Sequence, residues 1–210
     1  MDSKFFHVLE KIIDFLVLNI AFLVCCIPVL TIGPAISALY YQVHKQLFGG
    51  RGYVRDYFTA FKNSFKTAFG AWIVTLLVGL FLCIDIRITG VMYASGEAMG
   101  SLWMVFLVLL VVLFTYQVFL FAYIARFDDG LKVSLGNAFK LMMGNPLSAL
   151  GLMVMLVIFI VFTWLRMMFI FIMPGLYLVL AHSVLEACFR KNMTPEQLEH
   201  EDKLLEIENY

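Results

Sequence analysis

The chain has 210 residues, of which 62% are hydrophobic and only 14% are charged, whereas a soluble domain usually has about 25% charged residues. A water-soluble fold of this length could not cover so much apolar surface with a polar shell, so the excess must face lipid. The formal net charge of zero provides no basic field for nucleic acid. We therefore expect an all-α, polytopic bundle of transmembrane helices in a lipid bilayer.

Long apolar stretches define the predicted membrane spans. A helix needs about 20 apolar residues to cross the roughly 30 Å of hydrocarbon. A continuous apolar region near the C-terminus is too long for one crossing, and Arg166 with Pro174-Gly175 divides it in two. Short polar segments separate the other stretches. In chain order the predicted spans are 12–30, 67–88, 102–124, 147–164 and 168–188.

The segment 34–48 is ambiguous. It follows a tight Thr31-Ile32-Gly33-Pro34 turn, and proline is favoured at the start of a helix. Its roughly 15 residues reach only about 22 Å, less than a full crossing. It is either a short sixth span buried in the bundle or a re-entrant or interfacial helix.

Counting lysines and arginines beside the spans gives the orientation. If 34–48 crosses, 13 of the 15 basic residues lie on one side, and only Arg87 and Arg166 lie on the other. If it does not cross, Lys4 and Lys11 change sides and the split becomes 11 to 4. We therefore favour six spans, with both termini in the cytoplasm.

Two segments on the expected cytoplasmic side have the apolar period of an amphipathic helix. In 54–69 this face includes Tyr57, Phe61 and Phe65, and 131–143 places Leu131, Leu135, Ala138, Phe139 and Met142 opposite Lys132, Ser134, Asn137 and Lys140. Each segment leads into an outward span and contains Ala-Phe-Lys, a hint of an internal repeat. We assign 1–190 to the transmembrane domain and 191–210 to an acidic cytoplasmic tail.

Motifs for enzymatic chemistry are absent from the sequence. There is no phosphate-binding Gly-x-x-x-x-Gly-Lys-Ser/Thr loop, no His-Glu-x-x-His and no Gly-x-Ser-x-Gly. The four cysteines form no Cys-x-x-Cys pair, and most of them lie in apolar runs, where they resemble small packing residues. We expect no enzymatic activity, no cofactor and no metal centre.

Ionisable residues at membrane depth are costly unless they are paired. Asp85 and Arg87 lie near the outer end of the second predicted span, and Arg166 is expected at a similar level. We expect Asp85 to pair with Arg87 or with Arg166 from another helix. Structural pairing near the headgroups is favoured over a substrate site.

The last predicted span has a polar pair near its cytoplasmic end. His182 and Glu186 are four residues apart and therefore share one face of a helix. A hydrogen bond between them is favoured, and a proton relay is the alternative. Asn19, inside the first span, is expected to bond to a neighbouring helix, as buried amides in membranes do.

The most distinctive segment is 27–35, which contains Pro28, Thr31, Gly33 and Pro34. Two prolines and a glycine interrupt the helix here and leave backbone polar groups at membrane level without helical hydrogen bonds. These groups need partners in the protein or in a water-lined cavity. One interpretation is a tight hairpin corner in which Thr31 caps the following helix. The other is a binding site of the kind that broken helices build in transporters.

These residues resemble the YesL-like family, bacterial integral membrane proteins that form a domain of unknown function. The resemblance rests on Asn19, Ile27-Pro28, Thr31, Gly33-Pro34-Ala35 and Ala38, then on Gly49-Gly50-Arg51-Gly52-Tyr53 and Asp56-Tyr57-Phe58. The family usually has phenylalanine where Tyr57 stands. Its members look like companions of sugar ABC transporters in Gram-positive bacteria, and no catalytic residues can be carried over from them.

The resemblance implies an accessory or regulatory subunit that associates with a sugar ABC permease. The basic amphipathic segments, which could dock on a partner or on anionic lipid, agree with this hypothesis. A small stand-alone transporter or channel is the first alternative, motivated by the 28–34 corner. A membrane scaffold is the second. The oligomeric state does not follow from the sequence.

Overall fold

The computed structural model describes residues 2–47, 54–165 and 172–193, with side chains from Ile13 onward. The predictions for Arg166 and for most of the 191–210 tail fall outside these residues. Within them all regular structure is helical, as predicted. The elements are α1 (Asp2–Cys26), η1 (Val29–Thr31), α2 (Ile32–Leu47), α3 (Val54–Ala94), η2 (Ala98–Leu102), α4 (Trp103–Arg126), α5 (Leu131–Gly144), α6 (Pro146–Leu165) and α7 (Met173–Asn192).

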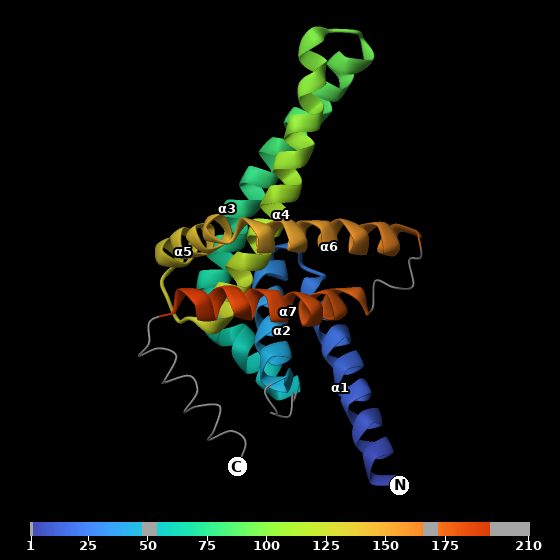
Figure 1. Cartoon of the computed structure of the whole chain (residues 1–210), viewed down its shortest axis with the longest axis vertical. Coiled ribbons are helices and arrows are strands. Elements are labelled where there is room, and N and C mark those ends of the chain that lie inside the picture. Colours follow the sequence, from blue (N-terminus) through green and yellow to red (C-terminus); the bar gives the residue numbers. More distant parts are fainter. Residues whose placement is uncertain (1, 48–53, 166–171, 194–210) are drawn as a thin grey trace.

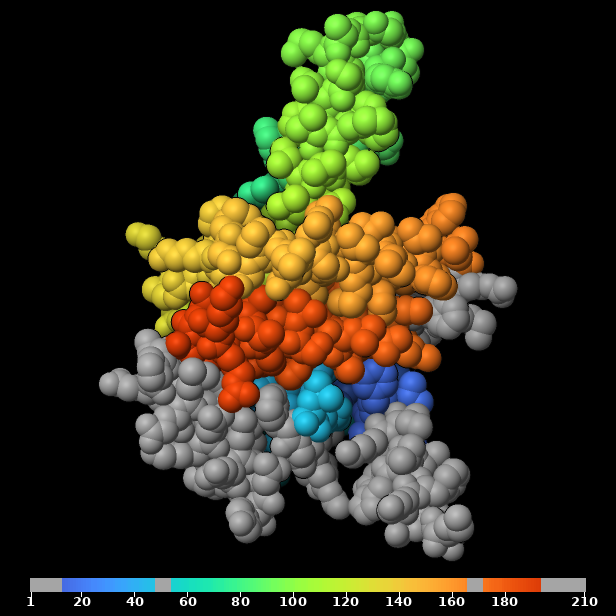
Figure 2. Space-filling view, viewed as in Figure 1, coloured from blue at the N-terminus to red at the C-terminus, as the bar shows by residue number. Residues whose placement is uncertain are grey.

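A long hairpin of α3 and α4 forms the axis of the molecule, and its tip projects beyond the other helices (Figures 1 and 2). The 41 residues of α3 extend about 60 Å, roughly twice the thickness of a hydrocarbon layer. The turn between the helices requires glycine twice. Gly96 has a φ of 80°, and a Cβ on Gly100 would lie 2.3 Å from the Tyr93 Cα.

The helix α2 runs back beside α1 after the η1 corner and packs against α3, α4 and α7 (Figure 1). Its buried face includes Ala35, Leu39 and Tyr40. Together with the first half of α3, the last turns of α4 and the inner face of α7, this face forms much of the core. The largest side chains in it are almost free of solvent: Tyr40, Tyr57, Phe119, Phe121 and Phe189.

Helices α6 and α7 lie across the direction of the α3–α4 hairpin instead of along it (Figure 1). Three helical segments of the described residues are long and apolar enough to cross a membrane, namely Val54–Ala94, Ala98–Arg126 and Pro146–Leu165. The structure therefore does not confirm six parallel spans. It confirms an all-helical protein with three such segments.

Large apolar side chains cover the surfaces of these three segments. Leu77, Phe81 and Ile84 on α3 are more than half exposed, and Leu147 and Trp164 on α6 are almost fully so. Soluble monomers rarely expose contiguous apolar areas of this extent. This distribution fits a lipid environment, as the composition predicts.

Two details of the predicted amphipathic segments need correction. The segment 54–69 is not a separate helix, because α3 continues through Gly70 without a break. In α5, Ser134 was assigned to the polar face but is buried. Its buried hydroxyl is satisfied by donating to the Gly130 carbonyl oxygen at 3.2 Å. Phe139, on the predicted apolar face, is half exposed and contacts the Tyr116 ring at its edge.

Candidate functional site

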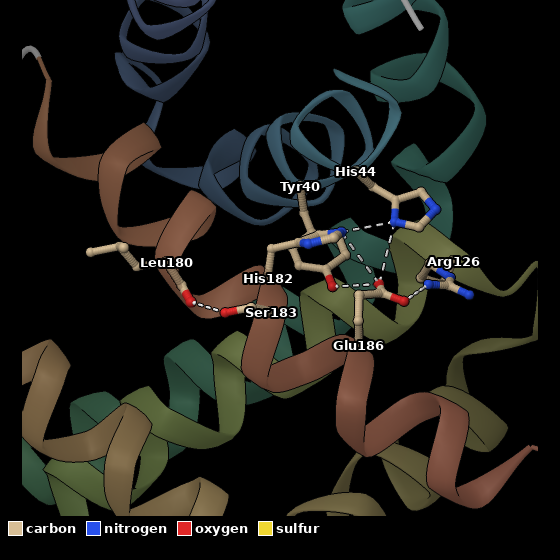
Figure 3. Close-up of polar contacts among 7 residues, drawn as sticks. All are labelled: Tyr40, His44, Arg126, Leu180, His182, Ser183 and Glu186. Atoms are coloured by element: carbon tan, nitrogen blue, oxygen red, sulfur yellow. Dashed lines mark hydrogen bonds and ion pairs between the residues drawn. The ribbon is translucent and has the colours of Figure 1, made fainter. Parts of the chain in front are cut away.

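Five polar side chains from three helices converge in the core at one end of α2 and α4 (Figure 3). Tyr40 and His44 lie one turn apart on α2, and His182 and Glu186 lie one turn apart on α7. Arg126 is the last residue of α4. Because residues four apart share a helix face, each of the two helices presents its pair to the other. We call these five residues the polar cluster.

Glu186 is the centre of the polar cluster. Its Oε1 accepts a hydrogen bond of 2.9 Å from the Tyr40 hydroxyl, and its Oε2 forms an ion pair with the Arg126 guanidinium. The side chains of Arg126 and Glu186 are each only 8% exposed. Charges buried to this degree need a partner, because losing water costs several kcal/mol per ion. The pair therefore fixes the end of α4 against α7.

The two histidines face each other and the same carboxylate. His44 Nδ1 lies 2.9 Å from His182 Nε2 and 3.3 Å from Glu186 Oε1. His182 Nε2 lies 3.6 Å from the same oxygen. A hydrogen bond between the two ring nitrogens requires one donor and one acceptor, so at least one imidazole is neutral in this arrangement.

A polar cavity of about 530 Å³ adjoins the polar cluster. It lies between α2, the first turns of α3 and the end of α4, and Arg126 borders both the cavity and the cluster. The Lys45–Asp56 ion pair, with a length of 2.9 Å, stands in its wall.

The predicted pairing of His182 with Glu186 is confirmed in part. Both side chains lie on one buried face of α7, as their spacing indicates. The expected direct hydrogen bond is wrong, because 3.6 Å exceeds the length of a hydrogen bond. His182 Nε2 pairs with His44 Nδ1 instead.

Asn19 bonds to a neighbouring helix, as predicted. Its Oδ1 accepts from the Gly175 backbone N–H at 3.0 Å, and its Nδ2 donates to the Phe15 carbonyl oxygen at 2.8 Å. The first N–H groups of a helix have no partner within it, so Asn19 on α1 supplies a cap for α7. A Cβ on residue 175 would lie 2.5 Å from the Asn19 amide nitrogen, so only glycine allows this approach.

The corner between α1 and α2 is closed by bonds within the protein. The Thr31 hydroxyl donates to the Cys25 and Pro28 carbonyl oxygens at 2.6 and 2.8 Å. The prediction that Thr31 caps the following helix is therefore wrong, because its hydroxyl donates to carbonyl oxygens at and just after the C-terminal end of α1. The Trp72 indole donates to the Val29 carbonyl oxygen at 2.8 Å.

Close packing also fills this corner. A Cβ on Gly33 would lie 2.6 Å from the Trp72 Cβ and 2.8 Å from the Ala68 carbonyl oxygen. Pro34, at the start of α2, is buried beside it. The geometry agrees with a tight hairpin corner, the first of the two interpretations.

The predicted site at Asp85 is not assembled among the described residues. No ion pair of 4.0 Å or less joins Asp85 to Arg87 there, Arg87 is exposed, and Arg166 lies outside the described residues. The Asp85 Oδ2 is buried and has no hydrogen-bond partner among the residues that the structure describes. The expected pairing with Arg87 is therefore wrong, and pairing with Arg166 stays a prediction.

Sequence reasoning missed Tyr40, His44 and Arg126 as members of the polar cluster. A signal was available for the first two, because a tyrosine and a histidine four residues apart lie on one face of the 34–48 helix. No local pattern marks Arg126, which is 60 residues from its partner.

A comparison with family models matches residues 15–86 to a protein family of unknown function, DUF624. The matched segment extends from the middle of α1 through most of α3, and includes Asn19, the corner and His44. The other members of the polar cluster after Tyr40 and His44, namely Arg126, His182 and Glu186, lie beyond it. No curated protein matches the chain, and no solved structure does.

Proposed function

We propose that the protein is a multi-pass protein of a bacterial plasma membrane that acts, without catalysis of its own, as an accessory or regulatory subunit of a carbohydrate ABC-type uptake system. The likeness of residues 15–86 to an unknown-function family agrees with the resemblance noted from the sequence, which supplies the context of sugar uptake. The exposed apolar helices support the membrane location.

In this proposal the α3–α4 hairpin crosses the bilayer and the polar cluster lies at its cytoplasmic end. The basic residues support this orientation. Arg55, Lys62 and Lys66 lie near the start of α3, and Arg126 ends α4, whereas Arg87 lies toward the hairpin tip. Both chain termini are then cytoplasmic.

The proposal of a partner rests on the apolar side chains that are exposed on the outer face of α5. Val133, Phe139 and Met143 are 49, 53 and 53% exposed, and the exposed Lys132 and Lys140 stand between them. In the proposed orientation this face lies at the cytoplasmic boundary. An aromatic anchor with flanking charges is typical of protein interfaces, and we assign the face to the permease subunits.

The corner at 28–34 favours a subunit over a stand-alone transporter. Transporter sites at broken helices leave backbone groups available to a substrate. Here the Val29 and Pro28 carbonyl oxygens accept bonds from Trp72 and Thr31, and Gly33 is closely packed. The 28–34 corner, which motivated the transporter hypothesis, therefore holds α1, α2 and α3 together.

The test is purification of the tagged protein in mild detergent from cells growing on complex glycans, followed by mass spectrometry. We expect sugar permease subunits in stoichiometric amounts. Phe139→Asp should reduce their recovery about tenfold or more, the effect of losing a central interface anchor. Arg87→Glu, an exposed change toward the hairpin tip, should leave recovery unchanged.

Recovery of the protein alone, under conditions in which a known permease complex stays intact, would contradict the proposal. An equal loss of partners with Phe139→Asp and Arg87→Glu would contradict the assignment to α5. Sugar uptake in a deletion strain gives an independent readout, and it should fall when the gene is removed and recover with the wild-type copy.

A further inference from the structure

We propose that His44, His182 and Glu186 form a binding site for one divalent transition-metal ion of the zinc class. Two imidazole nitrogens and a carboxylate oxygen are ligands that zinc takes in proteins, with a water in the fourth position. Their ligand atoms lie within 4.8 Å of one another. The proposal depends on the polar cluster alone and does not require that the protein serve a permease.

The spacing of the three atoms fits one ion. The sides of the triangle formed by His44 Nδ1, His182 Nε2 and Glu186 Oε1 are 2.9, 3.3 and 3.6 Å. Bonds of about 2.0–2.1 Å at tetrahedral angles place ligand atoms about 3.3 Å apart. The point equidistant from all three atoms is roughly 1.9 Å from each, so an ion slightly out of their plane reaches all of them with normal bonds.

The surroundings hold the carboxylate in the orientation that such a site requires. Arg126 pairs with Oε2, which leaves Oε1 directed at the two imidazoles (Figure 3). The Tyr40 hydroxyl donates to Oε1. Partners of this kind orient metal ligands, and their loss typically reduces metal affinity by about 10–100-fold.

The third feature is the partial exposure of the proposed site to solvent. The His44 side chain is 18% exposed, whereas His182 and Glu186 are 6 and 8% exposed, so the triangle opens on the His44 side. Lys45, next to His44, and Arg126 both line the polar cavity. A bound ion would join α2 to α7, which are far apart in the sequence.

The donor set selects the class of metal. Calcium and magnesium prefer sites made wholly of oxygen atoms, and imidazole suits zinc, copper, nickel and iron. With two neutral histidines and one carboxylate, the ligands carry a single negative charge, which the Arg126 guanidinium balances before any metal binds. We therefore expect reversible binding that responds to the supply of metal.

The test measures metal bound to the intact protein, purified in detergent with a tag that contains no histidine. After incubation with Zn²⁺ and removal of free metal, elemental analysis should find one ion per chain. Addition of Co²⁺ should produce the visible bands of four-coordinate cobalt. Zn²⁺ should also raise the thermal midpoint, because it binds the folded state.

His44→Gln is the most informative variant, because His44 is the most exposed of the three ligands and its loss should disturb the fold least. We expect it to weaken Zn²⁺ binding at least about tenfold and to remove the cobalt bands. The double variant His7→Gln/His200→Gln, which changes the other two histidines of the chain, should retain one ion.

Absence of bound metal in the wild-type protein would overturn the proposal and leave a hydrogen-bonded cluster. Wild-type affinity in His44→Gln would overturn it equally, and so would loss of the ion in the His7→Gln/His200→Gln variant. If His182→Gln does not fold, the wild-type stoichiometry and His44→Gln decide the question.

Discussion

Replacing Glu186 by glutamine removes the central charge of the polar cluster and keeps its shape. The amide oxygen can still accept from Tyr40, so that hydrogen bond, worth about 1 kcal/mol, is retained. The Arg126 guanidinium, 8% exposed like the Glu186 side chain, then loses its ion pair with Glu186. Removing one member of a buried pair costs about 3–5 kcal/mol. We therefore expect Glu186→Gln to lower the free energy of unfolding by about 3 kcal/mol.

A double-mutant cycle isolates the pair. Arg126→Met with Glu186→Gln removes both charges, so the double variant should be less destabilised than the sum of the two single changes, by about 2–3 kcal/mol. Unfolding in mixed micelles by a denaturing detergent, followed by tryptophan fluorescence, measures all four proteins. The matched control is Asp56→Asn, which breaks the Lys45–Asp56 pair. The side chains of Lys45 and Asp56 are 26 and 31% exposed. Their pair therefore contributes less than about 1 kcal/mol to the free energy of unfolding.

Two outcomes would refute this reasoning. A Glu186→Gln protein within about 0.5 kcal/mol of wild type would mean that Arg126 is solvated or paired elsewhere. Strict additivity of the two changes would mean that the charges do not interact. Either result would remove the basis for treating the polar cluster as a unit.

Two further predictions concern the helix contacts of α1 and α3. Gly175→Ala should cost about 1–3 kcal/mol, because its Cβ displaces the Asn19 amide and leaves a buried N–H unpaired; an unchanged thermal midpoint would show that the cap is unimportant. Trp72→Phe should cost about 1 kcal/mol by freeing the Val29 carbonyl oxygen. Trp103→Phe should cost less, because in the described residues its indole N–H has no partner, and equal losses would contradict the role of the bond.

The boundaries of α4 and α6 were predictable from the sequence, whereas those of α1, α3 and α7 differ from the predicted ranges by several residues. The predicted 102–124 and 147–164 are close to the observed Trp103–Arg126 and Pro146–Leu165, because polar residues and glycine or proline interrupt the apolar runs at these points. The fusion of 54–69 with the next span was not foreseen. Gly70 offers a possible break, but it packs against Leu131 inside a continuous helix, and such packing is a tertiary property.

The directions of α6 and α7 could not be predicted. Hydropathy measures whether a helix is long enough to cross a membrane, while its tilt depends on packing against its neighbours. The same limit applies to the polar cluster. The i, i+4 spacing of His182 and Glu186 is visible in the sequence, but His44 lies 138 residues from His182. No local pattern connects residues at that separation.

The measurement that most directly tests the account is the accessibility of single cysteines in whole cells. Cys25, Cys26, Cys83 and Cys188 are first replaced by alanine, and Ser95→Cys at the hairpin tip or Asp128→Cys beside the polar cluster is then introduced. A membrane-impermeant maleimide should label Ser95→Cys in intact cells and Asp128→Cys only after permeabilisation. Labelling of both positions from the same side would contradict a hairpin that crosses the membrane, and the reverse pattern would contradict a cytoplasmic polar cluster.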